Sequence, residues 1–381
     1  MNANVIALGV VSLLTDASSE MVIPLLPLFL SRELGAGPLA LGAIEGAANT
    51  VSSLLKLVSG RMTDLNGRRK PWILAGYALA ALTRPFVAVA TAPWQVLAIR
   101  LADRTGKGLR SSPRDAVLAG SVLPEQRAYA FGFHQAMDHL GAVIGPALAL
   151  VALWIWNGDL RMVFALSAIP ALLSLAVVAF AVKDIDTPAQ PHRPFLTRPS
   201  GPVLRILVPV TIFALGNVSE TFLLLRVGGT DAAVTTLPLL WMAFHAVKAA
   251  TSVPLGRWAD RVGRRTSILI GWSLFSMIYA GFAFIEHPTL QIALFLTYGL
   301  VPAFTDGSEK ALVADLSNGK ETGTAFGWFN MTTGLIALPA STLFGAIWQW
   351  FSPEAAFLTG AAFAAVASVA LYALIPRRIP T

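Results

Sequence analysis

The sequence contains no cysteine and little charge. None of its 381 residues is Cys, and Asp, Glu, Lys and Arg together make up 13%. The absence of cysteine excludes disulfide bonds, thiolate metal ligands and a thiol nucleophile. Soluble domains carry about 25% charged residues, so most of this surface does not face water. The 55% hydrophobic content and the mean hydropathy of +0.65 agree, and they indicate a membrane protein.

The sequence also lacks the usual marks of an enzyme. It has no phosphate-binding loop, metal-ligand cluster or nucleophile elbow, and the GKG at 106–108 lacks the spacing of a nucleotide loop. We therefore expect neither catalysis nor a cofactor. The net charge of +7 does not indicate nucleic acid, because the cations gather at the ends of apolar runs, where orientation in a membrane explains them.

Apolar runs of about 20 residues, the length that crosses a bilayer, recur along the chain. Backbone polar groups in lipid must pair within their own segment, so the runs are expected to be helices. No cleavable signal peptide is predicted, since the first run continues past residue 20. Twelve spans are predicted, at residues 4–30, 38–60, 71–91, 94–113, 127–154, 161–182, 203–226, 233–256, 266–285, 288–313, 322–349 and 354–376.

Lys and Arg are distributed unequally between the two sides of the predicted membrane. Most lie in the connections after even-numbered spans and at the C-terminus, while the other side holds Arg32, Arg161 and Arg226. Cytoplasmic loops carry the excess of positive charge. Both termini are therefore predicted in the cytoplasm, as an even number of spans also requires.

An internal repeat divides the chain. GRMTDLNGRRK at 60–70 follows the second span, and GRWADRVGRR at 256–265 follows the eighth; AFGF at 130–133 recurs as AFGW at 325–328. These near-constant offsets indicate a duplicated six-helix unit. The predicted organisation is an N-terminal bundle at 1–182, a polar, proline-rich cytoplasmic linker at 183–202 and a C-terminal bundle at 203–381.

The two repeated loops resemble the signature loop of the major facilitator superfamily. The matching residues are Gly60, Asp64, Gly67, Arg68, Arg69 and Lys70, then Gly256, Asp260, Gly263, Arg264 and Arg265. The resemblance implies a monomeric secondary carrier with its substrate site between two parallel repeats. It also implies that Asp64 forms a charge–dipole latch at a helix start, with Arg110 or Arg114 as partners. The alternative is a plain positive-inside loop.

Two further motifs resemble sequences within that superfamily. Arg104-x-x-Lys107-Gly108 is similar to the R-x-x-Q-G motif of proton-coupled members, with Lys in place of Gln. Gly141-x-x-x-Gly145-Pro146 is similar to an antiporter motif, which implies export.

The fourth span carries its cations on one helix face. Arg100, Arg104 and Lys107 share that face, and their expected partners are Asp103 and carboxylates of the first span. The alternative is a purely structural salt-bridge cluster.

Carboxylates also occur inside the predicted spans. Asp16 and Glu20 are four apart on the first span, and Glu45 lies on the second at a similar predicted depth. Carboxylates in a low-dielectric cavity can exchange a proton, and they attract cations. The alternative is that Glu20 pairs permanently with Arg84 or Arg104.

Other ionisable residues extend the candidate site. His134 and Asp138, four apart, are expected to form a proton relay. Glu220 and His245 are the candidates of the second half. The histidines, with Met137 and Met242, leave transition-metal transport as an alternative.

A gate is predicted from charge reversal between the halves. Glu309-Lys310 aligns with Arg114-Asp115 at an offset of 195, and complementary pairs of this kind would close a cytoplasmic gate. The alternative is two independent local pairs.

Taken together, these patterns predict a proton-coupled efflux carrier of the inner (cytoplasmic) membrane. Its partners would be a small-molecule substrate, protons and the lipid bilayer, without nucleic acid or a bound metal. The alternatives are a proton-coupled importer of a small solute or transition metal ion, and a channel.

Overall fold

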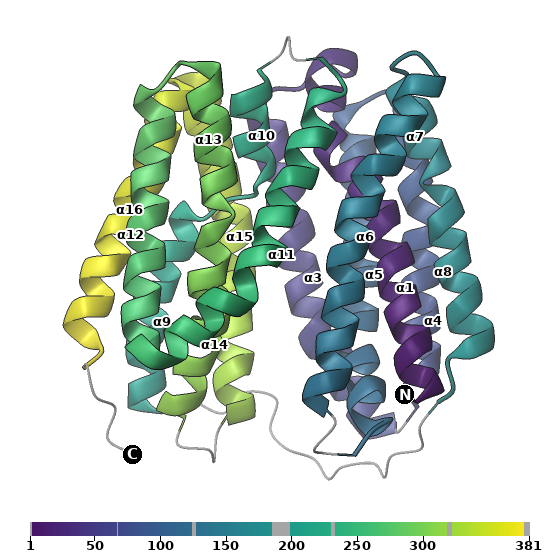
Figure 1. Ribbon diagram of the computed structural model, residues 1–381, viewed down its shortest axis with the longest axis horizontal. Helices are drawn as coiled ribbons and strands as arrows, with labels where there is room; N and C mark the ends of the chain where they lie inside the picture. The colour runs from purple at the N-terminus through teal and green to yellow at the C-terminus, as the bar shows by residue number, and fades with distance from the viewer. Residues whose placement is uncertain are drawn as a thin grey trace. The chain divides into compact units, whose positions relative to one another are not determined.

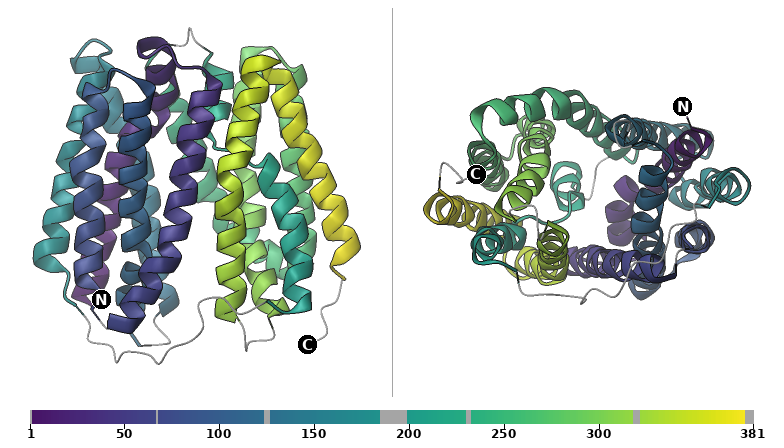
Figure 2. Two further views of the ribbon diagram at one scale, coloured as in Figure 1. Left: turned by 180° about the vertical axis from the view of Figure 1, so that it is seen from behind. Right: turned by 90° about the horizontal axis from the view of Figure 1, so that it is seen from below.

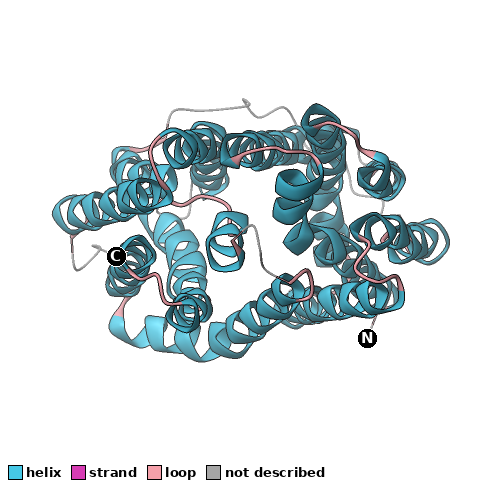
Figure 3. Ribbon diagram, turned by 90° about the horizontal axis from the view of Figure 1, so that it is seen from above, coloured by secondary structure: helices cyan, strands magenta, loops and turns pink. Residues whose placement is uncertain are grey.

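A computed structural model describes residues 2–66, 68–123, 127–184, 199–229, 233–317 and 322–376. Every regular element in these ranges is helical, and Figure 3 shows helices and connecting loops without a strand in the described ranges. In chain order (Figure 1) they are α1 (Ala3–Val22), η1 (Ile23–Leu25), α2 (Leu26–Leu28), η2 (Phe29–Glu33), α3 (Pro38–Asn66), α4 (Lys70–Thr83), η3 (Arg84–Val89), α5 (Pro93–Gly120), α6 (Arg127–Ile155), α7 (Leu160–Leu166), α8 (Ala168–Ala181), α9 (Gly201–Gly216), α10 (Thr221–Gly228), α11 (Thr236–Val262), α12 (Arg264–Phe284), α13 (Pro288–Tyr298), α14 (Leu300–Leu316), α15 (Thr322–Trp350) and α16 (Pro353–Leu374).

The helical class predicted from the sequence is confirmed. Within the described residues, nine helices or helix successions are long and apolar enough to cross a membrane. α3, α5 and α11 are outside this set; α5, for example, carries Arg100, Asp103, Arg104 and Lys107 in its middle. The exact number of twelve spans and the cytoplasmic position of the termini stay predictions.

The seventh predicted span is interrupted, which the sequence pattern did not indicate. α9 ends at Gly216, Asn217 adopts φ −87° and ψ 87°, and α10 begins at Thr221. The hydroxyls of Ser219 and Thr221 are 2.8 Å apart at the interruption. Non-helical backbone within a membrane is tolerated where protein or a water-filled cavity supplies its partners. The backbone groups freed at the interruption are therefore expected to find their partners in protein or water rather than in lipid.

Contacts divide the chain into two units. One consists of Met1–Ala36, Ala47–Arg193 and Thr230–Met242, and the other of Gly37–Gly46, Pro194–Gly229 and Ala243–Thr381. In the first unit α1 packs on α6 and α8, and α4 packs on α5 (Figure 1). In the second, α16 packs on α12, α9 and α15, and Figure 2 shows α15 and α16 side by side. The boundaries predicted for the two halves stay a prediction.

Equivalent contacts recur inside the two units. Arg69 donates from Nη1 to the Ala116 carbonyl at 3.4 Å, and Arg264 donates from Nη1 to the Ala311 carbonyl at 3.0 Å. Donor and acceptor are both displaced by the same 195 positions. The repeat seen in the sequence thus reappears as a repeated hydrogen bond at the start of α4 and of α12.

Small residues of α6 bring it into backbone contact with α1. A Cβ atom placed on Gly141 would lie 2.5 Å from the Leu13 carbonyl oxygen, and one on Gly145 would lie 2.5 Å from the Ala17 carbonyl oxygen. Pro146 follows directly within α6. Only glycine permits this approach, because any side chain would overlap the facing backbone.

We expect Gly145→Ala to destabilise the protein relative to Gly132→Ala. Both substitutions improve helix propensity equally, but the Gly132 position has no neighbouring atom within 4 Å. Overpacking costs about 1–3 kcal/mol, so Gly145→Ala should lower the thermal unfolding temperature in detergent while Gly132→Ala leaves it unchanged or raises it. Equal shifts for both variants would contradict the close contact.

Candidate functional site

A buried ion network joins three helical segments of the first unit. Arg84, at the start of η3, places Nη2 2.7 Å from Asp103 Oδ1, and Arg100 Nη1 lies 3.7 Å from Asp103 Oδ2. All three side chains are 4–5% exposed. Arg84 also donates from Nη1 to the Thr15 carbonyl at 3.2 Å and to Ser18 Oγ at 2.7 Å. The network therefore fixes α1, η3 and α5 to one another, away from solvent.

Glu20 has a different partner from the arginines considered in the sequence. Trp241 Nε1 donates to Glu20 Oε2 at 2.6 Å, and both residues belong to the first unit. Arg84 is instead bound to Asp103. Glu45 is buried on the part of α3 that belongs to the second unit.

Two carboxyl groups meet between α1 and α6. The side chains of Asp16 and Asp138 are hydrogen-bonded to each other, and Ser12 Oγ donates to Asp138 Oδ1 at 2.5 Å. An ionised carboxylate only accepts hydrogen bonds, so a bond between two carboxyl groups requires a proton on one of them. The close approach at Gly141, where a Cβ atom would lie 3.0 Å from Asp16 Cβ, positions this pair.

Cations of α5 surround the carboxyl pair. Lys107 lies within electrostatic range of both Asp16 and Asp138, and its side chain is exposed. Arg104 lies within range of Lys107 and of Asp103, and Arg114 lies within range of Asp138. Arg100 and Asp103 thus belong to a buried network, whereas Lys107 is an exposed cation near the carboxyl pair.

The relay predicted between His134 and Asp138 stays a prediction: the two groups lie within electrostatic range of each other, without a direct hydrogen bond between them among the described residues. His134 is buried, and its Nε2 has no hydrogen-bond partner among the described residues. Asp138 is engaged by Ser12 and Asp16 rather than by His134. His139 Nε2 lies 3.3 Å from the Gln135 amide nitrogen.

The second unit has its own charged cluster near the interruption between α9 and α10. Lys248 Nζ lies 3.0 Å from Glu220 Oε1 and 5.0 Å from the centroid of the Phe244 ring. The Lys248 and Glu220 side chains are 21% and 26% exposed. Asp306 of α14 lies within electrostatic range of Lys248, and the His245 ring packs edge-on against Phe244.

The predicted gating charges on α5 and α14 have partners in their own units. Arg114 pairs with its neighbour Asp115 at 2.8 Å. Glu309 accepts a hydrogen bond of 2.9 Å from Trp272 Nε1, and Lys310 lies within electrostatic range of Glu309.

Arg110, a predicted latch partner, is bound to α4. It donates from Nη1 to the Gly76 carbonyl at 3.3 Å, and its guanidinium lies 4.4 Å from the centroid of the Tyr77 ring.

Part of each signature loop lies outside the residues that the structure describes. The side chains of Asp64 and Asp260 lie outside the described residues. Arg68 is exposed, and Arg264 forms an ion pair with Asp315.

Asp184 was not predicted from the sequence. Its Oδ1 accepts from the backbone N–H groups of Arg69 and Lys70, each at 3.2 Å, where α4 begins. A carboxylate at a helix start satisfies unpaired donors and opposes the helix dipole. Asp306 was also missed, although an ionisable residue inside a predicted span is a functional candidate by default.

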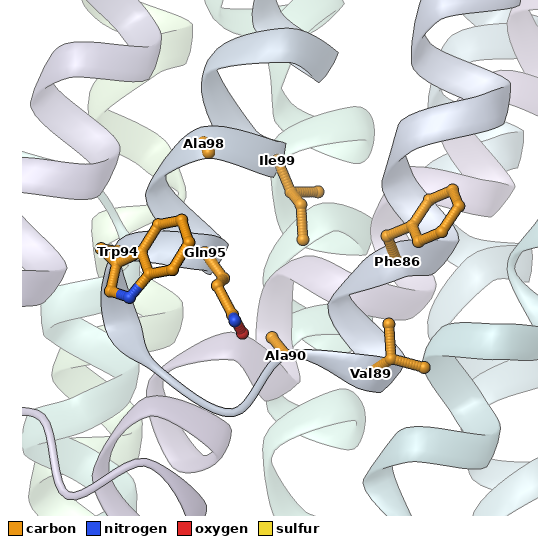
Figure 4. Close-up of a pocket in the computed structure, with 7 residues that line it drawn as sticks. All are labelled: Phe86, Val89, Ala90, Trp94, Gln95, Ala98 and Ile99. Atoms are coloured by element: carbon orange, nitrogen blue, oxygen red, sulfur yellow. The ribbon is translucent and has the colours of Figure 1, made fainter.

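A pocket of about 320 Å³ lies between η3 and the start of α5 (Figure 4). Its lining carries no charge, and consists of Phe86, Val89, Ala90, Trp94, Gln95, Ala98 and Ile99. The Trp94 side chain is 67% exposed. None of these lining residues is ionisable, so this pocket contributes no proton-binding side chain.

Ionisable residues inside apolar helices mark functional sites in membrane proteins, and they are typical of transporters. The family model described as Major Facilitator Superfamily matches residues 8–242 and 206–381. The chain therefore belongs to this superfamily of transporters, as its loops indicated, and it is not an enzyme.

Similar proteins are found in archaea and bacteria. The MFS-type transporter MJ1317 of Methanocaldococcus jannaschii is 30% identical over 97% of this chain and 94% of its own length. The multidrug resistance protein MdtH of Cronobacter sakazakii is 26% identical over 81% of this chain and 77% of its own length. The crystal structure of the nucleoside transporter NupG superposes with a TM-score of 0.75 at 12% identity, covering 98% of this chain and 99% of its own. That last likeness shows the fold alone.

Proposed function

We propose that the protein is a proton-coupled efflux carrier that exchanges protons for a small molecule by alternating access. The hydrogen-bonded pair of Asp16 and Asp138 carries this proposal. In this proposal the pair shares one proton, and it lies within electrostatic range of the exposed Lys107. A proton on this pair cancels negative charge that would otherwise attract a cationic substrate. Substrate and proton therefore compete, which is the requirement of antiport.

The charged surroundings of the pair define how it responds to pH. Lys107 on α5 places positive charge near both carboxyl groups, Arg114 places positive charge near Asp138, and Glu20 on α1 places negative charge near Asp16. Arg104 acts through Lys107, because two adjacent cations disfavour each other's charge. In this proposal Arg104 and Lys107 couple proton release to substrate binding, while Arg84 supports the structure.

The direction of transport is proposed from two observations. The glycine motif of α6, Gly141 and Gly145, contacts the helix that carries Asp16 and Glu20. Relatives at 23–26% identity are named multidrug resistance proteins. The resemblance of this motif to an antiporter motif and the names of these relatives support export across the cytoplasmic membrane, and the carboxyl pair is the reason for proposing a cationic substrate.

The proposed organisation has twelve spans in two halves, 1–182 and 203–381, joined by the cytoplasmic linker 183–202, with both termini in the cytoplasm. The recurrence of equivalent hydrogen bonds at Arg69 and Arg264 supports the duplication. We assign substrate contact in the second half to Glu220, His245 and Lys248, with Glu45 as a further carboxylate. Opening and closing is assigned to Asp64, Arg68, Arg110, Arg114, Asp115, Asp260, Arg264, Glu309 and Lys310.

Proteoliposomes with an acidic lumen test the proposal. An antiporter accumulates a cationic dye such as ethidium in exchange for luminal protons, and a proton uncoupler abolishes this accumulation. Accumulation driven only by an acidic exterior would instead identify an importer. Equilibration without accumulation, unaffected by the uncoupler, would identify a channel or facilitator. Across a panel of cationic, neutral and anionic compounds, only the cations are expected to exchange.

A further inference from the structure

A pocket of about 450 Å³ lies in the second unit where α9 and α12 begin and α16 ends. α16 packs against both other helices. The lining consists of Arg205, Arg265, Tyr372, Ala373, Leu374, Ile375 and Pro376. None of the transport residues proposed above belongs to it.

The charge of this pocket is one-sided. Two guanidinium groups line it without a carboxylate among the lining residues. Arg265 is held in place: its Nη2 donates to the Tyr372 carbonyl at 2.7 Å, and its guanidinium lies 4.8 Å from the centroid of the Tyr372 ring. Two cations that share a cavity repel each other unless an anion lies between them. Guanidinium groups present planar pairs of N–H donors that match phosphate oxygens.

Capping of α16 alone does not explain the pair of arginines. A cation near the last carbonyls of a helix is favourable, and this accounts for the bond from Arg265 to Tyr372. Arg205 makes no such hydrogen bond within the part of the chain that the structure describes, and its side chain is exposed. Arg205 therefore adds a second positive charge to the pocket, and this charge is not needed to cap the last carbonyls of α16.

The surface next to the pocket is apolar and faces outward. Val366, Val369 and Tyr372 follow one another at three-residue intervals on one face of α16, and they are 56%, 68% and 67% exposed. Tyr372, the last residue of this apolar stripe, also lines the pocket. A phosphate carried by an acyl chain would place its headgroup between the arginines and its chain along the stripe, whereas a free phosphate would make no use of the stripe.

We propose that this pocket binds the phosphate of an anionic phospholipid from the surrounding leaflet. Basic pockets between membrane helices bind lipid headgroups in this way, and phosphates lie at the level where membrane helices begin and end. The site is separate from the transport charges, so it stands or falls independently of the proposed function.

Native mass spectrometry of the purified full chain tests the proposal with phosphatidylglycerol, phosphatidylcholine and inorganic phosphate as probes. The wild type should retain phosphatidylglycerol in preference to phosphatidylcholine. Arg205→Gln should weaken phosphatidylglycerol binding by about tenfold, the loss expected for one charge-assisted contact, without weakening phosphatidylcholine binding. Arg257→Gln removes an exposed arginine of α11 outside the pocket, and it should leave both affinities unchanged.

Several outcomes would overturn the proposal. Equal retention of the two lipids, or equal losses in Arg205→Gln and Arg257→Gln, would reduce the arginines to general surface charge. Displacement of phosphatidylglycerol by inorganic phosphate would show a site for a soluble anion instead. Arg265→Lys provides a second variant: it keeps the charge but loses the paired donors, and it should weaken phosphatidylglycerol binding less than Arg205→Gln combined with Arg265→Gln.

Discussion

Asp138→Asn is expected to reduce dye accumulation driven by an acidic lumen to the rate of protein-free liposomes. The asparagine keeps the size of the side chain and a hydrogen-bonding oxygen for Ser12, but it cannot release a proton. Asp16 is then left without the second carboxyl group that shares its proton, so the proton exchange proposed for the pair is lost. The initial rate of uptake, compared with the wild type, measures this effect.

Exchange without a pH gradient separates coupling from general damage. Asp138→Asn should still exchange labelled for unlabelled substrate, because this exchange requires no net proton movement. Asp159→Asn is a matched control: Asp159 accepts from the backbone of Arg161 and Met162 at the start of α7, and asparagine serves equally well as a helix cap. Gradient-driven uptake by Asp138→Asn at the wild-type rate would remove the pair from the mechanism.

Asp103→Ala is expected to destabilise the protein by about 3–5 kcal/mol. The substitution leaves Arg84 and Arg100 buried with their carboxylate partner removed, and removing one member of a buried pair has a cost of this size. Thermal unfolding in detergent measures the change. The triple variant Arg84→Met, Arg100→Met, Asp103→Leu removes all three buried charges at a similar side-chain volume, and it should recover much of the lost stability.

The matched control is Asp115→Ala. Asp115 also pairs with an arginine, but its side chain is 47% exposed, and an exposed pair contributes about 0–1 kcal/mol. If Asp103→Ala and Asp115→Ala shift the unfolding temperature equally, the buried network at Arg84 does not stabilise the fold more than a surface ion pair does.

The helices could be predicted from the sequence because the membrane imposes their length and their internal hydrogen bonding. The interruption at Asn217 could not, because the residues around it read as part of a continuous apolar run. Only packing against the chain around it decides where such a run stops being helical. At Gly216 a Cβ atom would lie 2.6 Å from the Gly360 carbonyl, a contact between residues far apart in the sequence.

The sequence predicted which ionisable residues belong to the candidate site, but it did not predict most of the contacts between them. Arg100 and Asp103 are three apart on one helix, so their contact follows from helix geometry. Arg84 and Asp16 contact residues of other helices. The sequence alone does not determine how those helices are aligned along one another, so these contacts could not be predicted. For Glu20 a pairing with Arg84 or Arg104 was the alternative interpretation, and its observed partner is Trp241.

The backbone contact between α1 and α6 has a mechanical consequence. Glycines at 141 and 145 let the carbonyls of the facing helix fit between neighbouring side chains, so neither helix can slide along the other without steric overlap. The two helices are thus expected to tilt together as one lever during each transport cycle. Asp16 and Asp138 would then remain in register at every stage, and access of water, rather than separation of the two groups, would decide when the shared proton leaves.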